Sequence, residues 1–353
     1  MTAAALELAT TGSAPLSMTP LIALSDPGPI WVQLVKAVVI FIFVLQMAPL
    51  LVWAERRLLG RFQSRLGPNR VGPAGLLQPL ADVIKLVSKE ASTPATAVPK
   101  IMAIAPVISI ATAVLTLAII PFGAPGAYGG EFALAGIDVS IGILYFLAFG
   151  SIAFYGLMLG GWASGSKYSF LGSMRAAAQL VSYEVAIGLS LLGVAMAAGS
   201  LSLVEIVQAQ DKIWFVVPQF VGFLIFIVAG FAETARPPFD LPEADAELVQ
   251  GYNTEYGGMR FGSFFMAEYI EMIVIAGVAT ACFLGGWHGP GPAYLDPLWV
   301  ILKMTAIVLL FIWVRTTLPR LRYDQLMSFG WKVLLPLATL NALVTAILVV
   351  AFS

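Results

Sequence analysis

The chain has 353 residues, of which 59% are hydrophobic and only 11% are charged, and its mean hydropathy is +0.90. Soluble globular proteins carry about 25% charged residues, so this composition excludes a soluble domain and indicates a protein that folds in lipid. The 19 basic and 20 acidic residues give a formal net charge of -1, which favours neither nucleic acid nor an anionic partner.

Eight mostly apolar runs of about 20 residues, each long enough to cross a bilayer, follow one another along the chain. Gly, Pro or charged residues mark their ends. The sequence therefore predicts an all-α polytopic membrane protein with about eight transmembrane helices. The runs lie near residues 30–53, 101–121, 140–162, 177–199, 214–232, 263–286, 298–318 and 332–352.

The basic residues are distributed asymmetrically between the two sides of these spans. If the spans alternate in direction, 16 of the 19 Lys and Arg residues fall on one side, the exceptions being Lys36, Lys212 and Lys303. The positive-inside rule then places the segments 54–100, 163–176, 233–262 and 315–331 in the cytoplasm and both termini in the periplasm.

Within the first of these loops, Leu76, Leu80, Val83, Ile84 and Val87 follow helical spacing. This pattern predicts an amphipathic helix at the membrane interface or, equally, a helix packed on a partner subunit.

Residues 1–29 contain no Lys or Arg and four prolines, so they lack the basic start of a secretory signal. We expect a short periplasmic extension there, followed by one membrane domain over residues 30–353. The absence of a transit sequence and the length favour a bacterial inner (plasma) membrane, with a mitochondrially encoded chain as the alternative.

Electron transfer by this chain alone is excluded by its single cysteine, Cys282, and single histidine, His288. These cannot form a disulfide, a bis-histidine haem or an all-cysteine iron–sulfur cluster. We expect Cys282 to be a small buried hydrophobic residue and His288 to be a loop residue, and we predict no metal and no flavin bound by this chain.

Four acids lie inside or at the cytoplasmic end of predicted spans: Glu184, Glu233, Glu268 and Glu271. A carboxylate at the bilayer centre costs about 2.5–3.5 kcal/mol even on the most lenient scale, so such residues indicate function by default. All four lie in the cytoplasmic halves of their helices and could line a polar half-channel. The alternative is that each is neutral and hydrogen-bonded within the bundle, or reaches the interface.

A second acidic group lies in the loop after the fifth span, where Pro237, Pro238, Phe239 and Leu241 interrupt the charges. This pattern predicts a folded loop that returns toward the bundle, or otherwise a cytoplasmic salt-bridge network. Its acids are Glu233, Asp240, Glu243, Asp245, Glu247 and Glu255.

Five long stretches, which cover about a third of the chain, resemble one family. They are AERRLLGRFQSRLGPNRVGPAGLLQPLADVIKLVSKE from Ala54, SYEVAIG from Ser182, AETARPPFDLPEADAELVQGYNTEY from Ala232, MAEYIEM from Met266 and WVRTTLPRLRYDQLM from Trp313. Such composite motifs are far more specific than a single short pattern. They are similar to the quinone-site membrane subunit of respiratory complex I, the proton-pumping NADH:quinone oxidoreductase, called the H subunit in bacteria and subunit 1 in mitochondria.

The resemblance implies a translocase subunit of the respiratory chain that is not catalytically complete alone. Its loops would form the membrane side of a chamber for ubiquinone or menaquinone. NADH, FMN and iron–sulfur clusters would belong to partner subunits: the soluble subunit with the terminal cluster, a second soluble chamber subunit, and antiporter-like membrane neighbours.

By the same resemblance, two sets of residues receive roles. The chamber or coupling set is Glu55, Arg56, Arg65, Asp82, Arg236, Phe239, Asp240, Arg315 and Arg320. The proton path is Glu184, Glu233, Glu243, Glu247, Glu255 and Glu268, whereas Glu271 receives no role.

Two other classes of function remain open from the sequence. A proton-coupled secondary transporter would also need intramembrane acids, although no paired repeat of broken helices is evident between the halves of the chain. A membrane anchor of a related hydrogenase or other reductase would share the fold without binding quinone.

Overall fold

The computed structural model describes residues 30–125, 136–242 and 245–352, and every regular element within these ranges is helical. Each of the eight apolar runs overlaps one of the main helices, which confirms the predicted fold class. The helices are α2 (Ile30–Phe62), α4 (Pro99–Leu117), α5 (Gly142–Ala163), α6 (Lys167–Ala198), α8 (Phe220–Glu233), α10 (Gly258–Phe283), α11 (Asp296–Thr317) and α13 (Leu335–Phe352). Within the described ranges, six of the runs give helices long and apolar enough to span a membrane, and α8 is a shorter apolar helix.

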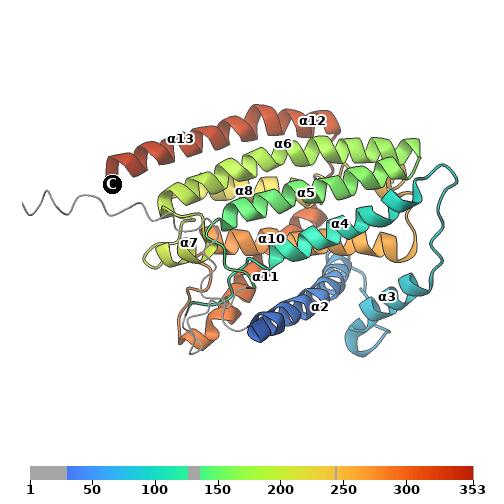
Figure 1. Cartoon of the computed structure of the whole chain (residues 1–353), viewed down its shortest axis with the longest axis horizontal. Coiled ribbons are helices and arrows are strands. Elements are labelled where there is room, and N and C mark those ends of the chain that lie inside the picture. The colour runs from blue at the N-terminus through green and yellow to red at the C-terminus, as the bar shows by residue number, and fades with distance from the viewer. Residues whose placement is uncertain (1–29, 126–135, 243–244, 353) are drawn as a thin grey trace, which may run out of the picture.

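Shorter elements connect these helices. They are η1 (Pro73–Gly75), α3 (Gln78–Ser88), α7 (Leu203–Ala209), α9 (Asp245–Leu248), η2 (Gly251–Asn253), η3 (Ala293–Leu295), α12 (Tyr323–Phe329) and the π-helical turn η4 (Gly330–Leu334). Figure 1 shows α3, α12 and the turn between α5 and α6 at one end of the molecule, with α7 and the C-terminus at the other. Segments predicted to be cytoplasmic thus lie together, while the side of the membrane that they face stays a prediction.

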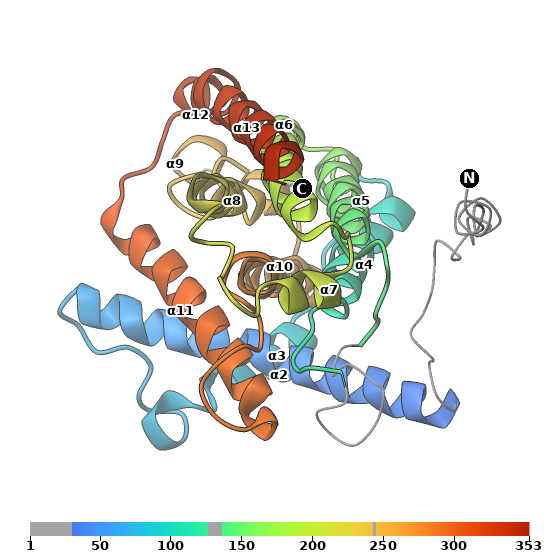
Figure 2. The same ribbon diagram turned by 90° about the vertical axis from the view of Figure 1, so that its left-hand side faces the viewer.

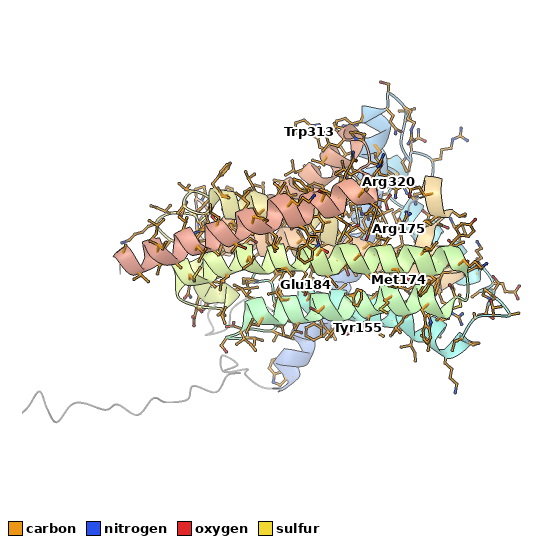
Figure 3. The ribbon with its side chains drawn as sticks, turned by 90° about the horizontal axis from the view of Figure 1, so that it is seen from above. Tyr155, Met174, Arg175, Glu184, Trp313 and Arg320 are labelled. Carbon is orange, nitrogen blue, oxygen red and sulfur yellow. The ribbon has the colours of Figure 1, made fainter. Side chains whose placement is uncertain are left out.

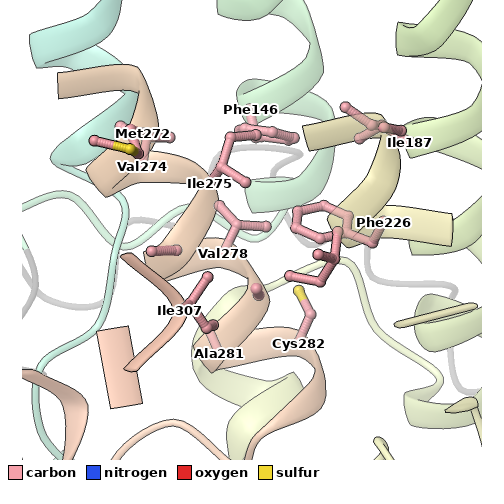
Figure 4. Close-up of a cluster of buried hydrophobic side chains, with 14 of the residues drawn as sticks. Phe146, Ile187, Phe226, Met272, Val274, Ile275, Val278, Ala281, Cys282 and Ile307 are labelled. Atoms are coloured by element: carbon pink, nitrogen blue, oxygen red, sulfur yellow. The ribbon is translucent and has the colours of Figure 1, made fainter. Parts of the chain in front are cut away.

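Helix α10 is the centre of the bundle. Figure 2, seen along the bundle, shows α10 surrounded by its neighbours, with α2 and α11 crossing beside it. In the most apolar stretch of α10, 83% of the residues are buried. In the corresponding stretches of α5 and of the α12–α13 segment, only 22% of the residues are buried. Its side chains pack with Phe146, Ile187 and Phe226 in the cluster of Figure 4, which also contains the fully buried Cys282 as expected.

Local sequence explains where several helices begin and end. Pro99 occupies the first turn of α4, where the missing N–H costs no hydrogen bond. Gly199 ends α6 with φ of 71°, in the left-handed region that glycine adopts without steric cost. Pro237 and Pro238 follow the end of α8, and proline cannot continue a helix.

Two helices extend beyond the spans that hydropathy predicts. Helix α2 continues past Trp53 to Phe62, and α6 begins at Lys167, so most of the predicted loop 163–176 is helical. The 32 residues of α6 correspond to about 48 Å, whereas a bilayer core is about 30 Å thick. Hydropathy detects where a helix leaves lipid, and a charged helix can continue into water.

The predicted amphipathic segment forms α3. Leu80, Ile84 and Val87 lie on its exposed side, with exposed fractions of 57–64%, while Val83 faces the bundle. Such an apolar outer face is suited to a bilayer interface or a partner subunit, so both sequence alternatives stay open.

We predict that close packing of α5 on α6 limits stability at Gly161. A Cβ at Gly161 would overlap the Cβ of Ser173 and lie 2.5 Å from the Ser169 carbonyl oxygen, so Gly161→Ala forces the helices apart. Overpacking of this kind costs about 1–3 kcal/mol. Gly188 on α6 is the matched control, because its Cβ would meet only Leu147 at an ordinary 3.7 Å.

The measurement is the fraction of protein that survives heating of native membranes before extraction in mild detergent. Gly161→Ala should lower the midpoint temperature, and Gly188→Ala should leave it unchanged or raise it. Equal midpoints for the two variants would contradict this packing.

Candidate functional site

Three charged side chains from different parts of the chain meet in the interior, at the end of the bundle where the loops predicted to be cytoplasmic lie. Glu55 on α2, Arg236 in the loop after α8, and Glu268 on α10 are 2%, 5% and 9% exposed. Arg236 Nη1 lies 3.6 Å from Glu55 Oε1, and Arg236 Nη2 lies 3.8 Å from Glu268 Oε2. Glu55 also forms an ion pair with Arg315 at the end of α11. We call these four residues the buried charge network.

Two tyrosines complete this network. The guanidinium carbon of Arg236 lies 4.1 Å from the centroid of the Tyr269 ring, and the Tyr252 hydroxyl donates to Glu268 Oε1 at 3.0 Å. Burial disfavours the charged guanidinium, but Tyr269, Glu55 and Glu268 outweigh that effect and raise the pKa of Arg236 above its ordinary value. Arg236 is therefore a permanent positive charge.

A cavity of about 260 Å³ lies next to the network, between α2, α3 and α10. Its wall is mostly apolar, with Arg56, Asp82 and Lys85 as the charged exceptions. Tyr269 lines the cavity and also contacts Arg236, so it links the two. The other lining residues are Ala48, Pro49, Val52, Pro79, Val83, Leu86, Phe261, Gly262, Phe265 and Met266.

The charged rim of the cavity is itself paired. Arg56 Nη1 lies 2.7 Å from Asp82 Oδ2, and Lys85 Nζ lies 3.4 Å from Asp82 Oδ1. Partial burial raises the pKa of Asp82, but the hydrogen bond and charge of Arg56 lower it more, so the net pKa lies below its ordinary value. Asp82 is therefore ionised at neutral pH and fixes Arg56 beside the cavity. Arg65 lies farther out. It lines, together with Arg56, another cavity of about 330 Å³ that is polar and lies at the surface.

Two membrane acids line a smaller cavity of about 30 Å³, large enough for water. Glu233 at the end of α8 and Glu271 on α10 both line it, together with Thr112 and Thr116 of α4. Glu233 Oε2 is buried and has no hydrogen-bond partner among the described residues. Glu268 and Glu271 lie three residues apart on α10 but belong to different sites: Glu268 contacts Arg236, whereas Glu271 lines the small cavity with Glu233.

Glu184 lies midway along α6 and accepts a hydrogen bond from the Ser151 hydroxyl of α5. Figure 3 shows it near the middle of the bundle, whereas Arg175 and Arg320 lie toward one end. Glu184 is close enough to Glu233 for the two acids to interact electrostatically.

The remaining predicted site residues lie in the loops that the sequence predicts to be cytoplasmic. Glu247 pairs with Arg175 at 2.5 Å, and the hydrogen bond with Arg175 lowers the pKa of Glu247 below its ordinary value. Arg320 is half-buried and acts electrostatically on Glu247. Phe239 is buried against the Tyr183 ring, at 5.9 Å between centroids.

Asp240 and Glu255 are each half-buried, and Glu243 lies outside the described residues. The acidic loop is thus folded back onto the bundle as predicted, although Glu247 also takes part in a surface salt bridge.

Several residues that complete these sites carried no signal in the sequence. Tyr252, Tyr269, Ser151, Thr112 and Thr116 are ordinary residues of loops and apolar helices until the fold brings them together. A role for Tyr269 could have been suspected because it directly follows Glu268 in the sequence. Adjacent residues of a helix point toward different neighbouring elements, so Tyr269 could contact what lies beside Glu268. No group of three or more His, Cys, Asp or Glu side chains placed to hold a metal occurs within residues 30–125, 136–242 and 245–352.

Comparisons with known proteins agree with the resemblance read from the loops. The model of the NADH dehydrogenase family matches residues 35–346. An NADH-quinone oxidoreductase H subunit of Geobacter metallireducens is 56% identical over 316 residues, which cover 89% of this chain and 95% of the relative.

Two further relatives bear the same description. The H subunit of Geobacter sulfurreducens is 56% identical over 312 residues, covering 88% of this chain and 94% of the relative. That of Syntrophobacter fumaroxidans is 51% identical over 316 residues, with 89% and 95% covered. The family match spans nearly the whole membrane bundle and includes all four residues of the buried charge network. The chain therefore belongs to the NADH dehydrogenase family, as a membrane subunit of the NADH-quinone oxidoreductase complex.

Proposed function

We propose that this subunit forms the membrane wall of a quinone chamber and passes the charge change of quinone reduction to its intramembrane acids. The observation that carries the proposal is the contact of one residue, Tyr269, with both the apolar cavity and Arg236. Through Arg236, that contact reaches two buried carboxylates. Ubiquinone or menaquinone is the substrate in this proposal.

The cavity has the chemistry that a prenylated quinone requires. An isoprenoid tail needs an apolar channel that opens toward lipid, and a quinone ring needs donors at one end. Phe261, Phe265 and Met266 supply the apolar wall, and Arg56 and Lys85 supply donors. The outer face of α3 presents exposed apolar side chains beside this channel, as a lipid-facing mouth requires.

Electrostatics supplies the coupling. Two electrons added to a quinone create negative charge that two protons must balance. A unit charge about 10 Å away, at an effective dielectric near 20, changes the free energy of ionising a carboxyl by about 1.7 kcal/mol, a little over one pKa unit. Glu55 and Glu268 are the first acids that would feel this change, because Arg236 binds both.

From there the proposed path continues to Glu233 and Glu184. Glu271 joins it, because Glu271 and Glu233 line the same small cavity between α4, α5, α8 and α10. The loop acids Glu243, Glu247 and Glu255 extend the path at the cytoplasmic side. Electrons come from NADH through the FMN and iron–sulfur clusters of soluble partner subunits, and antiporter-like neighbours receive the signal. The subunit lies in the bacterial inner membrane with both termini in the periplasm.

We predict that filling the larger cavity weakens use of quinone. Val83 lines the cavity, whereas the next residue, Ile84, is 61% exposed on the outer side of α3. Val83→Trp in the intact complex should raise KM for a long-chain quinone about tenfold, which is ~1.4 kcal/mol of lost binding. Ile84→Trp is the matched control and should leave KM within about twofold of the parent.

NADH:quinone activity in detergent-purified complex measures this effect, with NADH:ferricyanide activity as the check that the soluble arm is intact. The same KM for both tryptophan variants would place the quinone elsewhere.

We further predict that Glu233→Gln uncouples the membrane acids from electron transfer. The amide keeps the size of the side chain but cannot exchange a proton, so proton translocation in reconstituted vesicles should fall at least about tenfold. Glu205→Gln is the control, because Glu205 is an exposed acid on α7 at the opposite end of the bundle.

Fluorescence quenching of an acridine dye reports proton translocation, and NADH oxidation in the same vesicles reports turnover. Full pumping by the Glu233→Gln complex would remove this residue from the path.

A further inference from the structure

The segment 233–238 after α8 carries two groups of the proposed mechanism that point in different directions. Glu233 lines the small cavity with Glu271, whereas Arg236, three residues later, lies between Glu55 and Glu268. The conformation of this one segment therefore decides whether both groups are in place at once.

The backbone hydrogen bonds of the segment lie mainly at its two ends, where the Thr234 N–H donates to the Gly230 carbonyl at 3.0 Å and the Phe239 N–H donates to the Arg236 carbonyl at 2.8 Å. Pro237 and Pro238 have no N–H to donate. Ala235 has φ of 48°, in the left-handed region that a residue with a Cβ rarely adopts. The Arg236 N–H reaches the Phe231 carbonyl only at 3.3 Å. From outside the segment, the Leu321 N–H donates to the Pro238 carbonyl at 3.1 Å, and further hydrogen bonds come from one buried polar group.

Gln179 of α6 is that group. Its side chain is completely buried, and its amide nitrogen donates one hydrogen bond to the Ala232 carbonyl and one to the Phe239 carbonyl, each at 2.7 Å. A primary amide has two N–H groups, and both are used on the two ends of the segment. We call Gln179 with these two carbonyls the clasp. The reversed amide would place Oε1 against two carbonyl oxygens, so only one orientation closes it.

The helix that carries the clasp is anchored beside it. Tyr183, one turn after Gln179, packs on the Phe239 ring and donates from its hydroxyl to the Leu326 carbonyl at 2.9 Å. Glu184 follows directly on the same helix. The clasp thus connects α6, and with it Glu184, to the segment that carries Glu233 and Arg236.

We propose that Gln179 is a positioning residue that holds residues 233–238 so that Glu233 faces the proton cavity while Arg236 faces the quinone side. This inference rests on the proposed function and deepens it. Gln179 exchanges no proton and contacts no substrate; it fixes the geometry through which the two sites communicate.

Gln179→Leu in the holoenzyme tests the clasp, because leucine keeps an apolar volume and removes both donors. Gln210 provides a matched control. It is also completely buried, and its amide nitrogen donates to the carbonyls of Ile206 at 3.1 Å and Ala281 at 2.7 Å, at the far end of the bundle. Loss of Gln210 should therefore cost stability without disturbing the segment.

The readout is the number of protons translocated per NADH oxidised in vesicles, corrected for the amount of assembled complex. The Gln179→Leu complex should lose at least half of this ratio and about tenfold in kcat, with KM for quinone nearly unchanged, because the apolar cavity is not altered. The Gln210→Leu complex should keep the parental ratio even if less of it assembles. NADH:ferricyanide activity per complex should be the same in both.

A second variant keeps the test decisive if Gln179→Leu does not assemble. In Gln179→Glu, a protonated carboxyl can donate one of the two hydrogen bonds, whereas an ionised one donates none. Its proton-to-NADH ratio should be intermediate and should fall as the pH rises, unlike that of the parent.

The clasp would be overturned if both Gln179 variants kept the parental proton-to-NADH ratio. It would also be overturned if Gln210→Leu lost as much of that ratio as Gln179→Leu. If Glu233→Gln pumps normally while the Gln179 variants do not, the proposed proton path fails instead of the clasp.

Discussion

The structure depends on one buried cation. Arg236 is 5% exposed within an apolar bundle, and such a charge is tolerated only when opposite charges and hydrogen bonds replace the lost water. Glu55 and Glu268 supply the charges, Tyr269 supplies an aromatic face, and Arg315 balances the second charge at Glu55. Removing one partner of such a group typically costs about 3–5 kcal/mol, so α2, α8, α10 and α11 are bound to one another by their charges as well as by packing.

This constraint also brings the chemistry together. Because Arg236 must contact acids on α2 and α10, the loop after α8 is drawn into the bundle and Tyr269 is drawn against it. The same turn of chain leaves Glu233 and Glu271 lining one small, mostly apolar cavity. A substrate in the larger cavity would lie against Tyr269, which contacts Arg236, so its charge could act on the buried carboxylates electrostatically, without a continuous chain of hydrogen bonds.

The sequence was sufficient to predict the fold class and the positions of the main helices. Hydrophobic runs predicted the fold class, and the asymmetric distribution of basic residues predicted that the four loops lie at one end. Both predictions are possible because they depend on how single segments are solvated. Helix ends were less predictable: α2 and α6 continue past the membrane, since charged residues stop a span but not a helix. The acids and arginines were identifiable as isolated charges in apolar surroundings. Their partners were not, because Gln179, Tyr252 and Ser151 acquire meaning only through three-dimensional contact. The separation of Glu268 from Glu271 likewise depends on which helices surround α10.

In this mechanism Arg236 transmits the redox state of the cavity to the membrane acids. The most direct measurement of that role is the proton-to-electron ratio of the Arg236→Lys holoenzyme in vesicles, with KM for quinone determined in parallel. Lysine keeps the charge but loses the planar fork that reaches both carboxylates. We expect a KM within about twofold of the parent and a proton-to-electron ratio at least about twofold lower. An unchanged ratio would contradict this role, and a large rise in KM with an intact ratio would assign Arg236 to quinone binding alone.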